Sequence, residues 1–136
     1  MAINNLKANN KGANSFLNTE FAPFSLKGNS LFSDEYDDIY SSSQGAYDEC
    51  EHVFIKGNNL IERFRNLEFA SSFSVGEIGF GVGLNFLTTC KTWLEHTSPD
   101  KTLNFFSFDK YLFKYEDFKE IISLQSELTE QAQELI

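Results

Sequence analysis

Cysteine is scarce in this sequence, and long apolar runs are missing. The 136 residues include two cysteines, Cys50 and Cys90, whose separation matches no metal-binding motif and which are too few for a disulfide scaffold. No apolar run approaches the length of a membrane-spanning helix. The segment from Met1 to Lys11 is polar and lacks the apolar centre of a signal peptide. We therefore expect a cytoplasmic protein.

Positive charge is scarce as well. The chain has 20 Asp and Glu against 11 Lys and Arg, which gives a net charge of -9 at pH 7. Nucleic-acid-binding domains usually carry a basic surface, so this composition excludes a nucleic-acid binder that acts alone. It does not exclude an enzyme whose basic surface lies elsewhere. Hydrophobic residues make up 41% and aromatic residues 15% of the chain, enough to bury the core of one small domain.

The strongest signal is a glycine-rich stretch in the middle of the chain. The apolar run Phe73–Ile78 predicts a buried strand, and Leu84–His96 predicts a helix. Between them Gly79, Gly81 and Gly83 stand at alternate positions. A strand, a glycine turn and a helix in this order are typical of a nucleotide-binding corner, in which glycine lets a ligand approach the main chain closely. No Gly-Lys-Ser/Thr follows, which excludes a phosphate loop of the P-loop type.

The spacing of these glycines separates two classes of nucleotide. A dinucleotide site has its third glycine one residue later, where this chain has Leu84. With Glu77 two residues before the first glycine, the pattern E-x-G-x-G-x-G resembles that of S-adenosylmethionine (SAM) methyltransferases, whose acidic residue helps hold the methionine end. The alternative is a tight turn that binds no ligand.

A second apolar run of strand length, Leu103–Lys110, carries an acid near its end. Asp109 comes 26 residues after Gly83, which leaves room for one helix and a return connection. We therefore expect a right-handed parallel strand–helix–strand unit. A carboxylate at the tip of the second strand can accept hydrogen bonds from both hydroxyls of a ribose. The alternative for Asp109 is an ordinary loop acid.

The fold class that these signals predict is α/β. We expect the N-terminal half of a doubly wound, Rossmann-like parallel sheet at 21–136, preceded by a flexible arm at 1–20. A small β-rich segment should begin the domain, with a hairpin that turns at Lys27–Asn29. A complete sheet of this class needs more strands than the two counted here, so an apolar sheet edge should be left for something else to cover.

Other segments carry weaker signals. The acidic stretch Phe32–Ser41 is either a solvated loop or a lid over the site, with Tyr40 stacking or donating its hydroxyl. Cys50–Lys56 predicts a short strand, with His52 in a structural role. Asn59 and Glu62 fit a capping box that begins a helix over Leu60–Leu67.

In the helix after the glycines, one apolar stripe is expected to contain Leu84, Leu87, Thr88, Lys91 and Leu94, with Cys90 as a small core residue. Two more helices are expected at the end of the chain, Tyr115–Leu124 and Glu127–Ile136.

Four blocks of sequence together resemble one family. They are Phe32–Ser41 (F-S-x-x-Y-D-D-I-Y-S), Val53–Phe64 (V-F-I-x-G-N-x-L-x-x-R-F), Glu77–Leu87 (E-I-G-F-G-V-G-L-N-F-L) and Phe106–Lys110 (F-S-F-D-K). In this order and spacing they look like the N-terminal methyltransferase domain of MnmC, the family of tRNA wobble-uridine modification enzymes, from about Phe24 onward.

The resemblance implies a function and a set of site residues. Family members use SAM to methylate 5-aminomethyl-2-thiouridine in tRNA to the 5-methylaminomethyl form. In bifunctional members a C-terminal oxidase with FAD prepares that substrate. By resemblance the methionine part of SAM is held by Glu77, Gly79, Phe80, Gly81, Gly83 and Asn85. Asp109 then takes the ribose, and Asp38 and Tyr40 line the pocket entrance.

The chain departs from the family pattern in ways that keep other functions open. Asp109 stands where many relatives have Glu. The segment that receives the target amine, and the FAD domain, are expected beyond Ile136, so no catalytic residue is assigned. Three hypotheses remain: part of a tRNA methyltransferase, completed by a partner that supplies the missing half; an inactive remnant that binds SAM or a protein; or a small-molecule methyltransferase. No metal site is expected.

Overall fold

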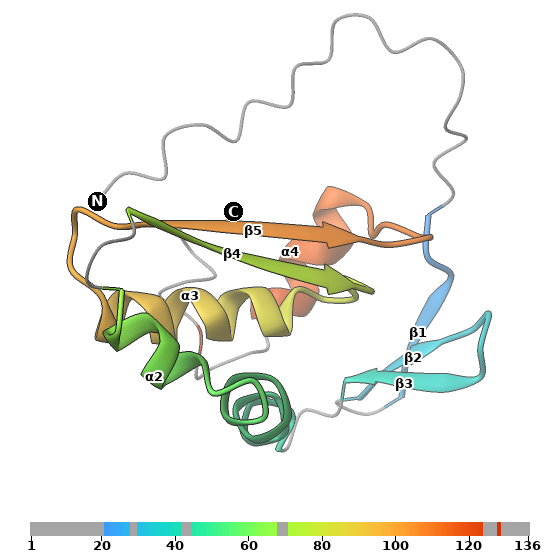
Figure 1. Ribbon diagram of the computed structural model, residues 1–136. Helices are drawn as coiled ribbons and strands as arrows, with labels where there is room; N and C mark the ends of the chain where they lie inside the picture. Colours follow the sequence, from blue (N-terminus) through green and yellow to red (C-terminus); the bar gives the residue numbers. More distant parts are fainter. Residues whose placement is uncertain (1–20, 28–29, 42–44, 68–70, 124–127, 129–136) are drawn as a thin grey trace, which may run out of the picture.

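Two parallel strands joined by a helix form the centre of the molecule. A computed structural model describes residues 21–27, 30–41, 45–67, 71–123 and 128 (Figure 1). Strand β4 (Ser72–Ile78) pairs in parallel with β5 (Thr102–Phe108), and helix α3 (Leu84–His96) connects them. The apolar runs and the glycine turn between them are local signals, and the predicted parallel strand–helix–strand unit is confirmed.

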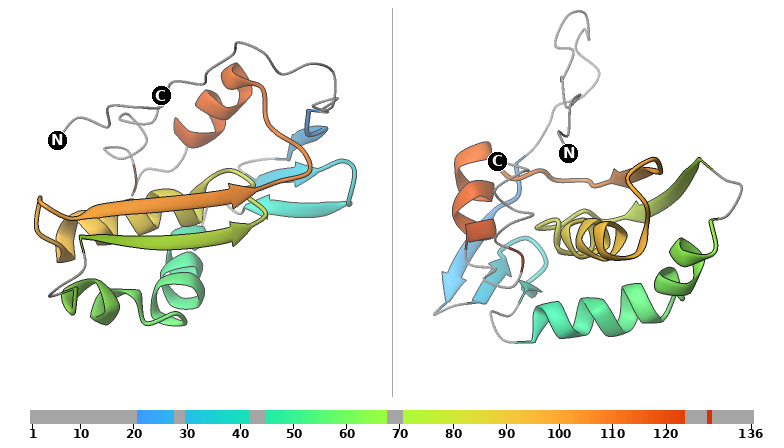
Figure 2. Two further views of the ribbon diagram at one scale, coloured as in Figure 1. Left: turned by 45° about the horizontal axis from the view of Figure 1, so that its top comes forward. Right: turned by 90° about the vertical axis from the view of Figure 1, so that its left-hand side faces the viewer.

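The two faces of this sheet differ in exposure. Along β4, Val75 and Glu77 are buried against the helices, while the alternate residues are exposed. Three apolar side chains stay on the open side: Ile78 is 95%, Phe108 72% and Phe106 56% exposed. One face of the sheet therefore carries exposed apolar side chains. Two views at right angles show α3 against one side of the strands (Figure 2).

The segment predicted as a strand at Cys50–Lys56 is helical, so that prediction is wrong. Helix α1 (Ala46–Cys50) runs directly into η1 (Glu51–Lys56), which has π-helical geometry. The amide of Gly57 donates to the carbonyl of His52 over 3.1 Å, a bond five residues back along the chain. Cys50 and Ile55, also five apart, are both buried. That spacing places both on one face of a wide turn, whereas a strand would place them on opposite faces.

Helix α2 (Leu60–Arg65) follows Asn59 as expected, but the predicted capping box is wrong. Asn59 has a positive φ of 51°, and its side chain caps nothing. Glu62 instead accepts a hydrogen bond of 2.8 Å from the side chain of Asn66 at the other end of the helix. A left-handed residue at the helix start turns its side chain away from the first amides, which prevents the capping geometry.

The main core lies between η1, α2 and α3. Phe64 packs edge-on against Trp93 (ring centroids 5.0 Å apart) and against Phe73 (5.1 Å). Buried Ile55 and Leu60 complete the cluster. Helix α2 therefore turns its apolar residues Leu60 and Phe64 into this core.

Helix α3 is buried on a wider face than the predicted stripe. Leu87 and Thr88 are buried as expected, but Leu94 is 55% exposed. Thr89, Thr92 and Trp93 are buried instead. The sheet covers α3 from one side and η1 with α2 from another, so the buried face extends around the helix beyond a single stripe.

A small antiparallel sheet precedes the helices. It contains β1 (Phe24–Lys27), β2 (Ser30–Ser33) and β3 (Asp38–Ser41), in that order. Lys27 pairs with Ser30, so the predicted hairpin is confirmed. The acidic stretch is not a loop throughout, because its last four residues form β3 and pair with β2.

Helix α4 (Tyr115–Ser123) links the two sheets. Its Ile121 lies in a cluster with Leu31 of β2 and Val82 of the glycine turn, and Ile122 packs on Leu87 of α3. Both isoleucines are buried, and the helix predicted at Tyr115–Leu124 is confirmed. The arm predicted at 1–20 lies outside the described residues, as does the helix predicted at 127–136 apart from Leu128. Among the residues with described positions, none of the helices is long and apolar enough to cross a membrane.

Replacing Phe64 with Ala should destabilise the chain strongly. Phe64 is 1% exposed, and a Phe-to-Ala change at such a site costs about 3–5 kcal/mol of unfolding free energy. Urea denaturation followed by circular dichroism measures the loss. Leu94→Ala on exposed α3 surface is the control and should change stability by less than about 1 kcal/mol. Equal losses in the two variants would contradict the assignment of this core.

Candidate functional site

The turn between β4 and α3 is built on three glycines with positive φ. Gly79, Gly81 and Gly83 have φ of 90°, 53° and 74°, angles that side chains rarely adopt. A Cβ at Gly83 would lie 2.8 Å from the ring of Phe80, so this glycine is needed for packing. A Cβ on Gly79 or Gly81 would meet nothing within 4 Å. These two glycines therefore leave open space above the main chain.

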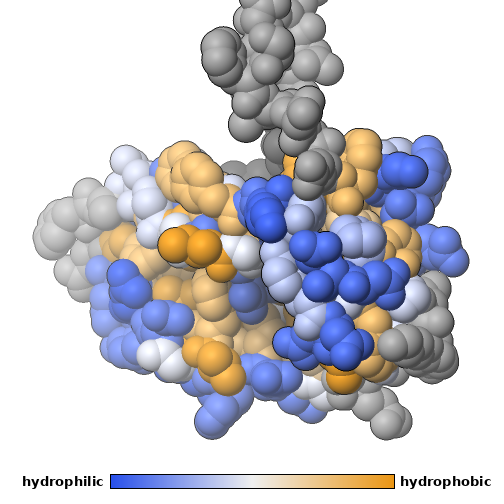
Figure 3. All heavy atoms as spheres, turned by 90° about the vertical axis from the view of Figure 1, so that its right-hand side faces the viewer, coloured by the Kyte–Doolittle hydropathy of each residue, from blue (hydrophilic) through white to orange (hydrophobic). Residues whose placement is uncertain are grey.

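A cavity of about 520 Å³ adjoins this turn. The turn and the start of α3 form one wall, and α1 with η1 forms the wall opposite. Its lining residues are Ile39, Ala46, Glu49, Cys50, Val53, Phe54, Gly79, Phe80, Gly81, Val82, Leu84 and Asn85. Apolar side chains lie between polar rims on this side of the molecule (Figure 3). The volume is within the range of small-molecule sites.

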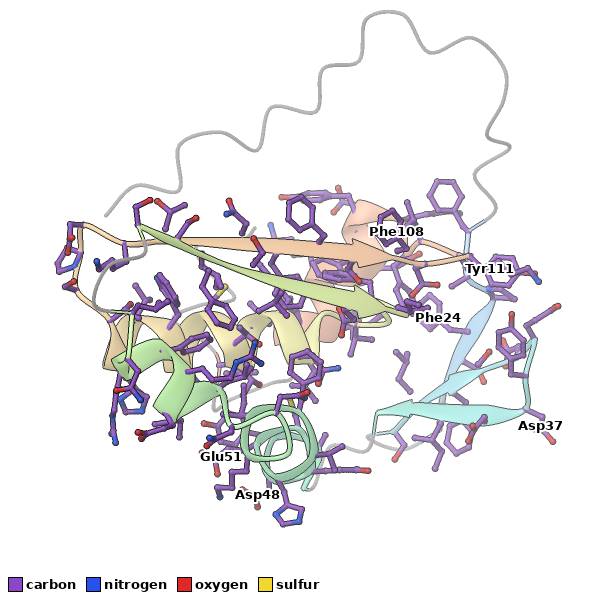
Figure 4. All side chains as sticks on the ribbon, viewed as in Figure 1. Phe24, Asp37, Asp48, Glu51, Phe108 and Tyr111 are labelled. Carbon is purple, nitrogen blue, oxygen red and sulfur yellow. The ribbon has the colours of Figure 1, made fainter. Side chains whose placement is uncertain are left out.

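The helix wall of the cavity has charged residues on both sides: Glu49 lines the cavity, and others face away from it. Asp48 and Glu51 lie on the side of α1 and η1 that is turned away from the strands (Figure 4). His52 is exposed on η1 and does not line the cavity. The half-exposed strand position expected for His52 is therefore wrong, because this segment is helical.

Glu77 is buried behind the cavity and holds two neighbours. It is 7% exposed. Its Oε1 accepts a hydrogen bond from Asn85 Nδ2, and its Oε2 accepts one from Ser107 Oγ, both over 2.8 Å. Glu77 and Ser107 are partners in the β4–β5 register, which puts both side chains on the same face. Glu77 is not among the residues that line the cavity, whereas Asn85 is.

Cys50 extends this group of polar side chains from α1. Its thiol donates to Asn85 Oδ1 over 2.9 Å. Burial raises the pKa of the Cys50 thiol. The thiol therefore stays protonated at neutral pH and keeps the proton that it donates. Neither Cys50 nor Ser107 was indicated by sequence, because a hydrogen bond between distant segments leaves no local pattern.

Asp109 lies at the glycine turn, where the sequence placed it. Its Oδ2 accepts from the amide of Gly81 over 2.8 Å, and its Oδ1 accepts from the amide of Tyr111 over 3.2 Å. The side chain is otherwise exposed at the carboxyl end of β5. In an open parallel sheet this end of the strands is where ligands bind.

Beside Asp109, the next two residues contact the acidic β2–β3 turn. The rings of Tyr36 and Tyr111 are 6.3 Å apart, and Lys110 Nζ lies 4.6 Å from the Tyr111 ring. Contact with Tyr111 raises the pKa of Lys110 to about 12. The hydroxyl of Tyr111 also donates to Glu35 over 3.4 Å. This contact holds the small sheet against the end of β5.

The two residues expected at the pocket entrance lie on β3. Asp38 is exposed, and its Oδ1 accepts from the adjacent amide of Ile39 over 2.7 Å. Ile39, between the two, lines the cavity. The side chain of Tyr40 is outside the described part of the structure. Within the described residues, no group of His, Cys, Asp and Glu could hold a metal ion.

Comparison with known proteins identifies relatives of this chain. No protein-family model matches the sequence. The bifunctional protein MnmC of Leptospira interrogans, named for tRNA 5-methylaminomethyl-2-thiouridine biosynthesis, is 42% identical over 104 residues, which are 76% of this chain and 16% of that protein. The protein of the same name from Legionella pneumophila is 38% identical over 107 residues, 77% of this chain and 16% of its own length.

A solved structure shows the same fold. The crystal structure of MnmC2 from Aquifex aeolicus aligns with a TM-score of 0.56 and 20% identity, over 76% of this chain and 36% of that one. The chain thus spans about a sixth of the length of the curated relatives above. The resemblance carried by the four sequence blocks is confirmed: the chain is homologous to one domain-sized part of the MnmC proteins.

Proposed function

We propose that the cavity binds S-adenosylmethionine and that the chain is the cofactor-binding part of a Rossmann-like class I methyltransferase. One observation carries the proposal: Asp109 accepts a hydrogen bond from the amide of Gly81, at the point where a β4–turn–α3 corner opens onto a cavity of about 520 Å³. Asp109 is not itself a lining residue of the cavity, but its hydrogen bond to Gly81, which is one, supports a ribose position beside the glycine turn. The cofactor fits this corner, because Gly79 and Gly81 leave room for close approach.

In the proposed arrangement, different residues contact the methionine part of SAM, its ribose and the entrance of the site. Gly79, Phe80, Gly81 and Asn85 hold the methionine part, with Gly83 shaping the turn for them. Asp109 keeps carboxylate lone pairs beyond the two used by backbone amides, and these accept from the ribose hydroxyls. Asp38 and Tyr40 of β3 belong to the entrance, next to Ile39 of the cavity lining.

The proposed reaction is methylation of the aminomethyl group on a tRNA wobble uridine, in the cytoplasm. SAM supplies a methyl group already activated by the sulfonium. The protein residues then contribute mainly orientation, a term that can reach about 7–11 kcal/mol. We assign no catalytic role to the described residues, which form the cofactor side of the site. The net charge of -9 favours a main tRNA-binding surface outside this chain.

One observation favours a second candidate, a SAM-binding module that needs a protein partner for activity. Ile78, Phe106 and Phe108 leave an exposed apolar surface on the sheet, as interaction sites do. Methyl transfer to tRNA by the chain alone would exclude this candidate. Transfer to small amines without tRNA would instead support a small-molecule methyltransferase.

Replacing Gly81 with Val should abolish SAM binding. The new side chain would enter the open space above the turn, and a β-branched residue at φ 53° strains the backbone. Isothermal titration calorimetry measures the affinity. Gly45→Val, at φ 84° and also in open space, is the matched control for strain and should keep the affinity. Unchanged binding by Gly81→Val would refute the proposed cofactor site.

Replacing Asp109 with Ala should weaken SAM binding by about 10- to 150-fold, the range for a lost hydrogen bond to a charged group. The same titration measures the loss. Asp100→Ala is the control, because Asp100 is an exposed aspartate just before β5, at the far end from Asp109. An equal affinity in Asp109→Ala and the wild type would show that Asp109 does not contact the ribose.

A further inference from the structure

Four polar side chains from four separate elements form one continuous hydrogen-bond network beside the cavity. Ser107 of β5 donates to Glu77 of β4, Asn85 of α3 donates to Glu77, and Cys50 of α1 donates to Asn85, over 2.8, 2.8 and 2.9 Å. Glu77 occupies the centre of this network. Asn85 and Cys50 line the cavity, while Glu77 and Ser107 do not.

The donors and acceptors in this network allow only one orientation of the Asn85 amide. A carboxylate accepts hydrogen bonds, so the NH₂ group of Asn85 must face Glu77. The carbonyl oxygen then faces Cys50, which must supply a proton. The thiol keeps that proton at neutral pH, since burial raises its pKa. Both ends of the amide are therefore fixed.

This orientation leaves Asn85 with groups to offer a ligand. The side-chain amide has two N–H donors and two acceptor lone pairs on its oxygen. The network uses one donor and one lone pair. One donor and one acceptor remain on a residue that lines the cavity. The methionine end of SAM is a zwitterion whose carboxylate needs a donor and whose ammonium needs an acceptor, so the remaining pair is complementary to it.

We propose that Glu77 is a positioning residue, which acts on the cofactor through Asn85, and that Ser107 and Cys50 hold the two ends of this network. The inference rests on the proposed SAM site and deepens it. A carboxylate that is buried and does not line the cavity has a different task from a carboxylate that contacts the ligand's ammonium. Removing its charge while keeping its shape separates the two roles.

The test uses two ligands and the full 136-residue chain. S-Adenosylhomocysteine carries the amino-acid end, and 5′-methylthioadenosine lacks it. Calorimetry on Asn85→Ala should show that the affinity for S-adenosylhomocysteine falls at least about tenfold. The affinity for 5′-methylthioadenosine should change by less than about twofold. A change that merely disturbed the fold would weaken both ligands.

Glu77 variants decide between positioning and direct contact. Glu77→Gln keeps an acceptor for Asn85 and a group for Ser107, so it should bind S-adenosylhomocysteine within about threefold of the wild type. Glu77→Ala should weaken the affinity for S-adenosylhomocysteine about as much as Asn85→Ala does. In the double variant Glu77→Ala/Asn85→Ala, the affinity for S-adenosylhomocysteine should stay within about threefold of that of Asn85→Ala alone, because the effects of residues that act through one another are not additive.

The outer residue of the network gives a smaller effect. Ser107→Ala should weaken the affinity for S-adenosylhomocysteine about threefold. Ser74→Ala, on the exposed side of β4, is the control and should leave the affinity unchanged.

Two kinds of contrary result are distinguishable: one overturns the positioning role of Glu77, and the other overturns the proposed SAM site. A loss above about tenfold in Glu77→Gln, or a further loss when Glu77→Gln is added to Asn85→Ala, would overturn the positioning role and show direct contact with the ammonium. This pair of measurements is decisive even if Glu77→Ala does not fold. A wild-type chain that folds but binds neither ligand would overturn the proposed function itself, and the inference with it.

Discussion

The parallel pairing of β4 with β5 determines which side chains meet at the glycine turn. Its register places Glu77 opposite Ser107 and Ile78 opposite Phe108. Because parallel strands end at the same edge, the turn after β4 and the residue after β5 meet there, and Asp109 reaches the amide of Gly81. A shift of one residue would turn Glu77 to the open face and separate it from Asn85.

The same edge concentrates features that are unfavourable for stability. Three glycines with positive φ lose more conformational freedom on folding than other residues would. A buried carboxylate is costly unless its oxygens are hydrogen-bonded. Glu77 meets that condition through Asn85 and Ser107. Unfavourable backbone and buried charge in one place are common where a protein binds a ligand, which agrees with the cavity beside this turn.

The cavity depends on two parts of the chain that approach from different sides. The continuous α1–η1 segment supplies one wall, and its π-helical turn sets Ile55 in the core while Cys50 reaches Asn85. The small sheet contributes Ile39 at the rim and is tied to the end of β5 through Tyr36 and Tyr111. Helix α4 joins these parts, since Ile121 packs against both Leu31 and Val82.

Local sequence patterns predict the strand–glycine–helix–strand unit and the position of Asp109. These patterns are apolar runs of strand length, glycines where side chains are excluded, and a helix bounded by Gly83 and Pro99. The other features depend on tertiary packing. Cys50–Lys56 has enough β-branched and aromatic residues for a strand, but packing against α3 buries residues five apart and makes it helical. The partnership of Ser107, Glu77, Asn85 and Cys50 likewise joins segments up to 57 positions apart in sequence, and a contact of that kind exists only after the strands have paired and the helices have packed.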